Sequence, residues 1–282
     1  MNMREKRDSL TRPRVAHVIQ NLNYGGMERV LHNLGQGLPN HGFDIHIVVL
    51  EYLGRFAEGL DGTVTFHQVP PMSKLSLFHS RELAAVFRAI APDIVHSHTG
   101  VWMKAAGAAK RARVRVVLHT EHGRPVPDRL TDRGIDGLAS RRTDAVIAVS
   151  EVLSEVLRRR IVHDPARVRM IPNGVDVDTL RPPTDQAALR ARLNIPPNVP
   201  VIGSIGRLEP VKNYALALQA FARLKSLGDR GTAPILVLVG DGSERKGLEA
   251  LATTLGIASQ VKFLGWRQDA ESIYGAFDLF TL

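Results

Sequence analysis

Short runs of β-branched and other apolar residues alternate with segments of helical periodicity along most of the chain. The first apolar run, at 15–19, is followed by a glycine loop and by an amphipathic segment at 27–38. Parallel strands need such helical crossovers, so this alternation predicts an α/β, doubly wound sheet with helices on both faces. The remaining predicted strands are 44–50, 64–69, 93–96, 114–119, 144–149, 167–171, 201–205, 235–239, 261–264 and 278–282, and the remaining predicted helices are 81–90, 151–161, 186–193, 213–227, 243–255 and 270–274.

A proline-rich stretch predicts where the chain divides. It runs from Pro172 through Pro182 and Pro183 to Pro196 and Pro197. A length of 282 residues corresponds to about two domains at roughly 150 residues each. We expect two Rossmann-like domains whose strand-end loops face one another across a cleft. The predicted parts are a disordered tail at 1–13, a first domain at 14–184, a linker region at 185–198 and a second domain at 199–282.

Composition excludes several kinds of site. The chain has no cysteine, so disulfides, thiolate zinc sites and cysteine nucleophiles are ruled out. No apolar run approaches the ~18 to 20 residues of a membrane span, and the first dozen residues lack the apolar stretch of a secretory signal. A cytoplasmic protein, soluble or associated with a membrane, is therefore expected.

Most of the excess positive charge belongs to the first half of the chain. Residues 1–184 hold 26 basic and 19 acidic side chains (+7), whereas 185–282 hold 11 and 9 (+2). Basic clusters at 110–113 and 158–160 suit anionic lipid, nucleic acid or a phosphorylated substrate, although a solvated face is the commoner explanation of any one cluster. Aromatic residues do not interleave with these clusters, which weakens the case for nucleic acid.

Glycine-containing loops follow predicted strands, at the edge where doubly wound sheets bind ligands. Gly25 and Gly26 precede a helix, where the backbone can approach a phosphate. The sequence there matches neither the dinucleotide fingerprint nor a P-loop, and a tight strand–helix connection explains it equally well. A further glycine loop, with Gly240 and Gly242, suits a nucleotide but is weak evidence alone.

The loop at 203–213 is more informative. Arg207 and Lys212 stand five positions apart between Gly206 and a helix start, where both can clamp a diphosphate. Arginine offers a planar fork and lysine a point charge, and two fixed cations stabilise negative charge that develops on a leaving group. A pair of surface cations without a ligand is the alternative explanation.

Histidines supply a second candidate site. His96 ends one predicted strand and His98 follows it, and His119 ends the next strand and His122 follows that one. Side-chain alternation places His119 and His122 on opposite faces, so adjacent strand ends are expected to bring His98 and His122 together. His122 is predicted to form a hydrogen bond in the ligand cleft, and His96 is predicted to be structural. No closed set with metal-ligand spacing appears, and no metal is expected.

These motifs occur together in the order typical of one family. The chain resembles a retaining glycosyltransferase of family four, with the two-domain GT-B fold, from roughly Val15 to its end. Each motif is common, but the ordered set is specific. The stretches are Gly25-Gly26-Met27-Glu28, Glu121-His122-Gly123, Val146-Ile147-Ala148-Val149-Ser150-Glu151, Ile171-Pro172-Asn173-Gly174-Val175-Asp176, Gly206-Arg207-Leu208 with Lys212, Val239-Gly240-Asp241-Gly242 and Phe263-Leu264-Gly265.

The resemblance implies transfer of a sugar from a nucleotide-sugar donor to a glycan or lipid-linked acceptor, with retention, in surface polysaccharide or lipopolysaccharide synthesis. Arg207 and Lys212 would hold the diphosphate without a metal or other cofactor, and His122 would contact the transferred sugar. The basic first domain would bind the acceptor at an anionic membrane surface, as a peripheral protein on its cytoplasmic face, and no nucleic acid is expected. The implied donor-binding residues are Gly25, Gly26, Gly206, Gly240, Gly242, Leu264 and Trp266.

One departure from the family pattern concerns the second domain. The family carries two glutamates in an E-x7-E pattern and a returning C-terminal helix, and this sequence stops at Leu282, before either of them. We therefore expect an incomplete second domain, a truncated chain and low or absent activity.

Three other functions fit part of the sequence. A non-catalytic nucleotide- or glycan-binding regulatory module would keep the first-domain surface and lack turnover. An epimerase or phosphorylase with the same architecture is disfavoured by the loop at 206–212. A nicotinamide oxidoreductase is disfavoured because neither half has the dinucleotide fingerprint.

Overall fold

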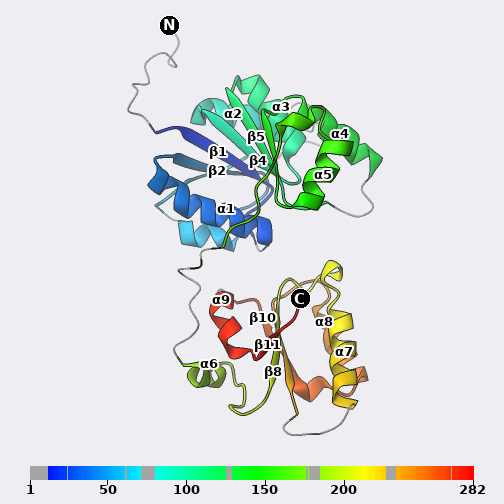
Figure 1. Cartoon of the computed structure of the whole chain (residues 1–282). Helices are drawn as coiled ribbons and strands as arrows, with labels where there is room; N and C mark the ends of the chain where they lie inside the picture. The colour runs from blue at the N-terminus through cyan, green and yellow to red at the C-terminus, as the bar shows by residue number, and fades with distance from the viewer. Residues whose placement is uncertain are drawn as a thin grey trace. The chain divides into compact units, whose positions relative to one another are not determined.

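The computed structural model describes residues 12–23, 25–60, 62–70, 80–124, 129–175, 177, 185–226, 233–267 and 269–282. The chain divides into two compact units, Met1–Gly174 and Val175–Leu282 (Figure 1). Most of the tail predicted at 1–13 lies outside the described residues, as do 178–184 at the predicted domain boundary.

The first unit is built on a seven-stranded parallel sheet, with strand order β3-β2-β1-β4-β5-β6-β7. Its strands are β1 (Arg14–Ile19), β2 (Asp44–Val49), β3 (Thr65–Gln68), β4 (Ile94–His98), β5 (Val116–Glu121), β6 (Ala145–Ala148) and β7 (Val168–Met170). Its helices are α1 (Gly26–Gly37), α2 (Arg81–Ile90), α3 (Trp102–Ala112), α4 (Leu130–Ser140) and α5 (Glu151–Arg160), with short 3-10 turns η1 (Leu38–His41), η2 (Arg55–Leu60) and η4 (Pro165–Arg167).

Both faces of this sheet are covered, as the sequence pattern predicts. Along β1, Val15 and Ile19 pack with α1 and η2, whereas Ala16 and Val18 pack with α2, α3 and α5. Burial on both faces explains why the strands read as continuous apolar runs. The strand order reverses between β1 and β4, and the crevice beyond the carboxyl ends at such a reversal is where doubly wound sheets bind ligands.

The second unit contains a four-stranded parallel sheet, with strand order β10-β9-β8-β11, so its order reverses between β8 and β11. Its strands are β8 (Val201–Ile205), β9 (Ile235–Val239), β10 (Val261–Gly265) and β11 (Leu279–Phe280). Its helices and turns are α6 (Gln186–Arg192), η5 (Pro210–Lys212), α7 (Tyr214–Ser226), α8 (Arg245–Thr254), η6 (Ala258–Gln260), α9 (Ala270–Ile273) and η7 (Tyr274–Ala276).

The region at 185–198, which the sequence predicts as a linker, differs in the structure. It lies in the second unit, where α6 packs on the core of β8 and β9 through Leu189, Leu193 and Ile195. The buried Arg190 donates to the carbonyl oxygen of Ala276 at 3.0 Å, which fixes the helix on η7. Prolines in this stretch mark the end of a packed helix rather than an inter-domain connection.

Two helices, α3 and α4, are absent from the sequence prediction. In α3 the buried residues are mostly alanine, whose small side chains mark a core face less clearly than leucine or valine, and α4 contains two glycines, which disfavour a helix. No helix among the described residues has both the length and the apolar character that a membrane span requires.

Candidate functional site

The first glycine loop opens at the start of α1. Gly25 precedes the helix in an extended conformation, and its carbonyl oxygen accepts from the Arg29 N–H at 3.0 Å. A Cβ at Gly25 would overlap the Glu28 carboxylate, whereas a Cβ at Gly26 would meet nothing within 4 Å. Gly26 therefore lies beside open space at a helix N-terminus, which suits an anion. Tyr24, which precedes these glycines, lies outside the described residues.

The predicted meeting of His98 and His122 is confirmed. His98 Nδ1 lies 3.0 Å from His122 Nε2, and the His122 backbone N–H donates to Thr99 Oγ1 at 2.7 Å. His96 is buried and its Nε2 lies 2.7 Å from Thr120 Oγ1, which fits a structural role. The carboxyl ends of β4 and β5 thus hold His122 by both its backbone and its ring.

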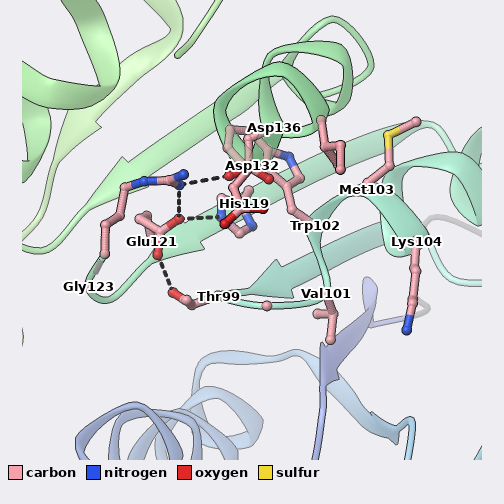
Figure 2. Close-up of a pocket in the computed structure, with 13 residues that line it drawn as sticks. Thr99, Val101, Trp102, Met103, Lys104, His119, Glu121, Gly123, Asp132 and Asp136 are labelled. Atoms are coloured by element: carbon pink, nitrogen blue, oxygen red, sulfur yellow. Dashed lines mark hydrogen bonds and ion pairs between the residues drawn. The ribbon is translucent and has the colours of Figure 1, made fainter. Parts of the chain in front are cut away.

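A second polar network lies on the opposite face of β5, around a cavity of about 270 Å³ (Figure 2). Glu121, buried at the end of β5, accepts from Thr99 Oγ1 at 2.6 Å and from Arg124 at 3.0 Å. Arg124 also pairs with Asp136 on α4 at 2.8 Å. His119 lies under this network, with its ring stacked on that of Trp102 at a centroid distance of 3.9 Å. The cavity is therefore lined by fixed charges of both signs.

The two carboxylates of this network respond differently to burial. Burial acts to raise the pKa of Glu121, but the nearby His119 ring, the hydrogen bond from Thr99 and the charge of Arg124 hold that pKa below its usual value. For Asp136, burial outweighs the Arg124 contact, and its pKa is raised. Glu121 is accordingly the firmer anionic partner of Arg124.

Burial keeps four histidines of the first unit, His17, His96, His98 and His122, neutral. Desolvation lowers the pKa of His17 and of His122 to about 4, and it lowers the pKa values of His96 and His98 well below 6.5. Near neutral pH these rings therefore act as hydrogen-bonding groups rather than as cations.

The free energy of unfolding is expected to fall as the pH drops from 6.5 toward 4. A histidine with a depressed folded-state pKa is neutral when folded and takes up a proton on unfolding below pH 6.5, so acid favours the unfolded chain. With a folded pKa of about 4, His17 is expected to account for roughly 2 kcal/mol of this loss at about pH 5. Chemical denaturation at about pH 7 and about pH 5 measures it.

Two variants isolate the contribution of His17. His17→Gln removes the titrating ring and should reduce the loss between the two pH values by about that amount, whatever it does to stability itself. His41→Gln, which alters an exposed ring on η1, should leave the loss unchanged. An unchanged pH dependence in His17→Gln would contradict the prediction.

The strand ends of the second unit are tied together through glycines. The Gly206 N–H donates to the carbonyl oxygen of Val239 at 2.9 Å, and the Gly240 N–H donates to that of Gly265 at 2.8 Å. Gly240 has a φ of +136°, and a Cβ there would overlap the Gly206 carbonyl oxygen. Gly242 is similarly packed against the Leu208 carbonyl oxygen. These glycines let the backbones of the loops after β8 and β9 lie in direct contact. The sequence alone does not distinguish this structural role from a role in donor binding.

Glu209 joins the loop after β8 to the loop after β9. No sequence motif marked this residue. Its carboxylate accepts from the Ser243 N–H at 3.1 Å and from Ser243 Oγ at 2.7 Å, and these bonds lower the pKa of Glu209. The Leu208 N–H also donates to the Asp241 carbonyl oxygen at 3.0 Å. An acidic residue just before Pro210 in a strand-end loop was the available signal.

Lys212 lines a cavity of about 370 Å³ beside the carboxyl ends of β8 and β11, the two strands between which the sheet order reverses. Ser204 and Thr281 come from the ends of the two strands, and Tyr214 begins α7. Burial raises the pKa of Tyr214, whose hydroxyl is hydrogen-bonded to Ser204. Arg207 is exposed in the same loop but does not line this cavity. The structure therefore brings Lys212, and not Arg207, to the sheet's reversal point.

Leu264 and Trp266, the last two predicted donor-binding residues, lie at the carboxyl end of β10. Leu264 is half-buried and packs against the core of β8 and β9, so its side chain is occupied structurally. Trp266 is half-buried just beyond Gly265, whose φ is +70°. The carbonyl oxygen of Gly265 accepts a hydrogen bond from the Gly240 N–H. The end of β10 and the two glycine loops are therefore connected along one edge of the sheet.

Comparison with known proteins assigns the family. The model of Glycosyltransferase Family 4 matches residues 24–179, more than half of the chain, and that of Glycosyl transferases group 1 matches 185–282. The chain belongs to glycosyltransferase family 4. This glycosyltransferase is 29% identical over 287 residues to the UDP-Gal:alpha-D-GlcNAc-diphosphoundecaprenol alpha-1,3-galactosyltransferase of Escherichia coli, covering 95% of this chain and 73% of that protein. It is 34% identical over 213 residues to the D-inositol 3-phosphate glycosyltransferase of Mycobacterium sp. (strain JLS), covering 67% of this chain and 46% of that protein.

Solved structures show the fold of this glycosyltransferase. Anabaena HepE in complex with UDP-glucose matches with a TM-score of 0.78 and 25% identity, over 95% of this chain and 72% of that chain. WaaG, a glycosyltransferase involved in lipopolysaccharide biosynthesis, matches with a TM-score of 0.71 and 17% identity, over 94% and 74%. The predicted GT-B fold, with two Rossmann-like units, is thus confirmed.

Proposed function

We propose that this glycosyltransferase transfers a sugar from a nucleotide-sugar donor to a glycan or lipid-linked acceptor, with retention at the anomeric carbon, in surface polysaccharide or lipopolysaccharide synthesis. The name of the E. coli relative supports a nucleotide-sugar donor and a lipid-diphosphate acceptor for that protein, and HepE was solved with UDP-glucose. The donor and the acceptor in the name of the E. coli relative both carry a diphosphate, as does the UDP-glucose bound to HepE, so a chain that used such substrates would need fixed cations and backbone N–H groups at its strand ends.

One observation carries the proposal, and it is the position of Lys212. Lys212 lines the cavity at the β8–β11 reversal and precedes α7, a helix of 13 residues whose first N–H groups have no partner within the helix. A diphosphate placed there would meet an ammonium and a helix N-terminus together. Arg207, on the same rigid loop, would supply a second cation as the nucleoside diphosphate leaves.

The other predicted residues then have defined tasks. Gly26 lets the backbone approach the donor phosphate or sugar, and His122 contacts the transferred sugar. The Gly206, Gly240 and Gly242 loops fix the edge on which the nucleotide lies, and the backbone from Leu264 to Trp266 reads the base. Two cations carry the leaving-group charge in this scheme, so it needs no bound metal.

A peripheral position on the cytoplasmic face of a membrane completes the proposal. The exposed basic cluster at 158–160 ends α5 in the first unit, the unit with the larger net charge. Each cation near an anionic surface contributes up to about 1 kcal/mol. A lipid-linked acceptor would be presented at that surface.

The experiment starts from the full chain and a panel of nucleoside diphosphates. Calorimetry identifies the base that binds, and the matching nucleotide sugars are then assayed for diphosphate release and, by NMR, for the anomer formed. Release with retained configuration supports the proposal. Binding without any turnover would favour a non-catalytic nucleotide-binding module, and no binding by any diphosphate in the panel would overturn the proposed site.

A further inference from the structure

The proposed function gives no task to the cavity of about 270 Å³ in the first unit (Figure 2). This cavity opens at the carboxyl ends of β4 and β5, between α3 and α4. Its lining includes the loop that follows β4, a strand at the reversal of the sheet. The cavity therefore adjoins the crevice in which doubly wound sheets bind ligands.

The inner wall of the cavity is a network of buried ion pairs. Arg124 pairs with both Glu121 and Asp136, and Thr99 donates to the other oxygen of the Glu121 carboxylate. The side chains of Glu121 and Arg124 are only 4% and 9% exposed, so the network is well shielded from water. Because two carboxylates face one guanidinium, this wall repels an anion and offers oxygens that accept hydrogen bonds from hydroxyl groups.

Two charged side chains of the lining form no ion pair with any residue that the structure describes. They are Lys104, on the first turn of α3, and Asp132, on the first turn of α4, where it accepts only from the neighbouring Thr131 hydroxyl at 3.4 Å. Asp132 lies one turn before Asp136 on the same face of α4. Figure 2 shows Lys104 extending away from the carboxylates. The cavity thus has a cationic end and a carboxylate end.

The size and the rim of the cavity limit what it can hold. A volume of about 270 Å³ is at the lower end for ligand sites, so it suits one sugar ring rather than a whole nucleotide. A Cβ added at Gly100 or Gly123 would meet nothing within 4 Å, so the loops after β4 and β5 both present open backbone. A small polar ring can therefore approach from the strand ends.

We propose that this cavity binds a sugar phosphate, the part of a lipid-linked acceptor to which the new sugar is added. Hydroxyl groups of the ring donate to Asp132 and Asp136, and the phosphate lies against the ammonium of Lys104. The assignment to an acceptor rests on the proposed function, whereas the binding of a sugar phosphate does not.

Simpler ligands satisfy only part of the lining. Inorganic phosphate would use Lys104 and would be repelled by the carboxylates at the other end of the cavity. An uncharged sugar would use the carboxylates and leave Lys104 without a partner. Only a ligand that carries both hydroxyl groups and an anion engages the two ends together, so we expect such a ligand to bind more tightly than either part.

Saturation-transfer NMR on the full chain, without any nucleotide, tests this expectation. The probes are α-glucose 1-phosphate, α-galactose 1-phosphate and N-acetyl-α-glucosamine 1-phosphate, each compared with its methyl glycoside and with inorganic phosphate. At least one sugar phosphate should bind with a Kd of about 1 mM, the value expected for a ligand of this size. Its methyl glycoside should bind about tenfold more weakly, because one charge-assisted contact is missing. The proposal is overturned if no sugar phosphate binds, or if inorganic phosphate binds equally well.

Substitutions at the two ends locate the bound probe. Lys104→Met should weaken the sugar phosphate about tenfold and leave the methyl glycoside unchanged, whereas Asp132→Asn should weaken both. Lys110→Met, at the exposed far end of α3, is the matched control, and Lys212→Met tests the cavity of the second unit. Circular dichroism verifies folding. Weaker binding in Lys212→Met, with unchanged binding in a folded Lys104→Met, would place the probe in the second unit and overturn the proposal.

A turnover assay connects the cavity to the proposed function. Once a donor has been found, the sugar phosphate that binds serves as the acceptor, and Lys104→Met should raise its KM about tenfold at unchanged kcat. If the sugar phosphate binds here and no nucleotide sugar is turned over, the proposed function fails and the binding site stands. If turnover occurs and Lys104→Met leaves KM unchanged, the acceptor site is wrong and the proposed function stands.

Discussion

Replacing Lys212 with alanine is expected to weaken the binding of the preferred nucleoside diphosphate by between ten- and a hundredfold, the value of one charge-assisted hydrogen bond. The substitution removes the ammonium from the cavity at the β8–β11 reversal and leaves only the N-terminus of α7 facing the phosphates. Arg207→Ala is expected to act mainly on turnover, with a loss of roughly a hundredfold, because its fork meets charge that develops as the diphosphate leaves. Calorimetry and initial rates measure the two effects.

Matched controls make this division testable. Lys246→Ala removes an exposed lysine of α8, outside the cavity lining, and should leave both quantities unchanged. Lys212→Arg keeps the charge and should recover part of the affinity. Equal diphosphate affinity in wild type and Lys212→Ala would show that the cavity is not the diphosphate site, even if the chain turns over a nucleotide sugar.

The sequence predicts the strands better than the helices. Strands such as β8 and β9 are buried on both faces, so their apolar, β-branched runs are visible without any partner and their bounds are predicted to the residue. Helices α3 and α4 were not predicted, because α3 buries mostly alanine, a residue common in many structures, and α4 contains two glycines, which disfavour a helix. The helix α6 was predicted, but its place in the second unit depends on contacts with η7, about 90 residues later.

In the candidate sites, too, features set by the local sequence were predictable, whereas contacts between residues far apart in the chain were not. Loops after strands were predictable, because carboxyl ends of parallel strands share one edge, and the His98–His122 contact follows from side-chain alternation. The contact between His17 and His98 was not predicted, because it depends on β4 pairing with β1, about 80 residues away in sequence. Glu209 was missed for a similar reason, since its partner Ser243 lies 34 residues away.

The two units share one rule of construction. In the first, His17 Nδ1 lies 3.2 Å from His98 Nε2 across the reversal between β1 and β4, and in the second, Lys212 lies at the reversal between β8 and β11. Neighbouring loops turn away in opposite directions at a reversal, which opens a crevice there. The crevice favours ligand binding at the two reversals over the other strand ends. The side chains at both reversals can bind a ligand, because they are imidazoles in the first unit and an ammonium in the second.

Replacing Gly240 with alanine is expected to destabilise the second unit by at least about 3 kcal/mol, more than most single substitutions. The residue has a φ of +136°, a conformation that other residues rarely adopt, and the added Cβ would overlap the backbone carbonyl oxygen of Gly206. A backbone atom cannot rotate away as a side chain can. Relief therefore requires the loops after β8 and β9 to separate, which breaks the hydrogen bond from the Gly206 N–H to the Val239 carbonyl oxygen.

Hydrogen exchange measured by mass spectrometry localises this effect, and Gly247→Ala is the matched control. Gly247 lies in α8 with nothing within 4 Å of an added Cβ, so alanine there should stabilise the helix by roughly 0.5 to 1 kcal/mol. Peptides from β8, β9 and β10 should exchange faster in Gly240→Ala, while those of the first unit serve as an internal reference. Unchanged protection of these strands in Gly240→Ala would mean that the glycine is kept for ligand approach, because the packing of the two loops would then tolerate a side chain.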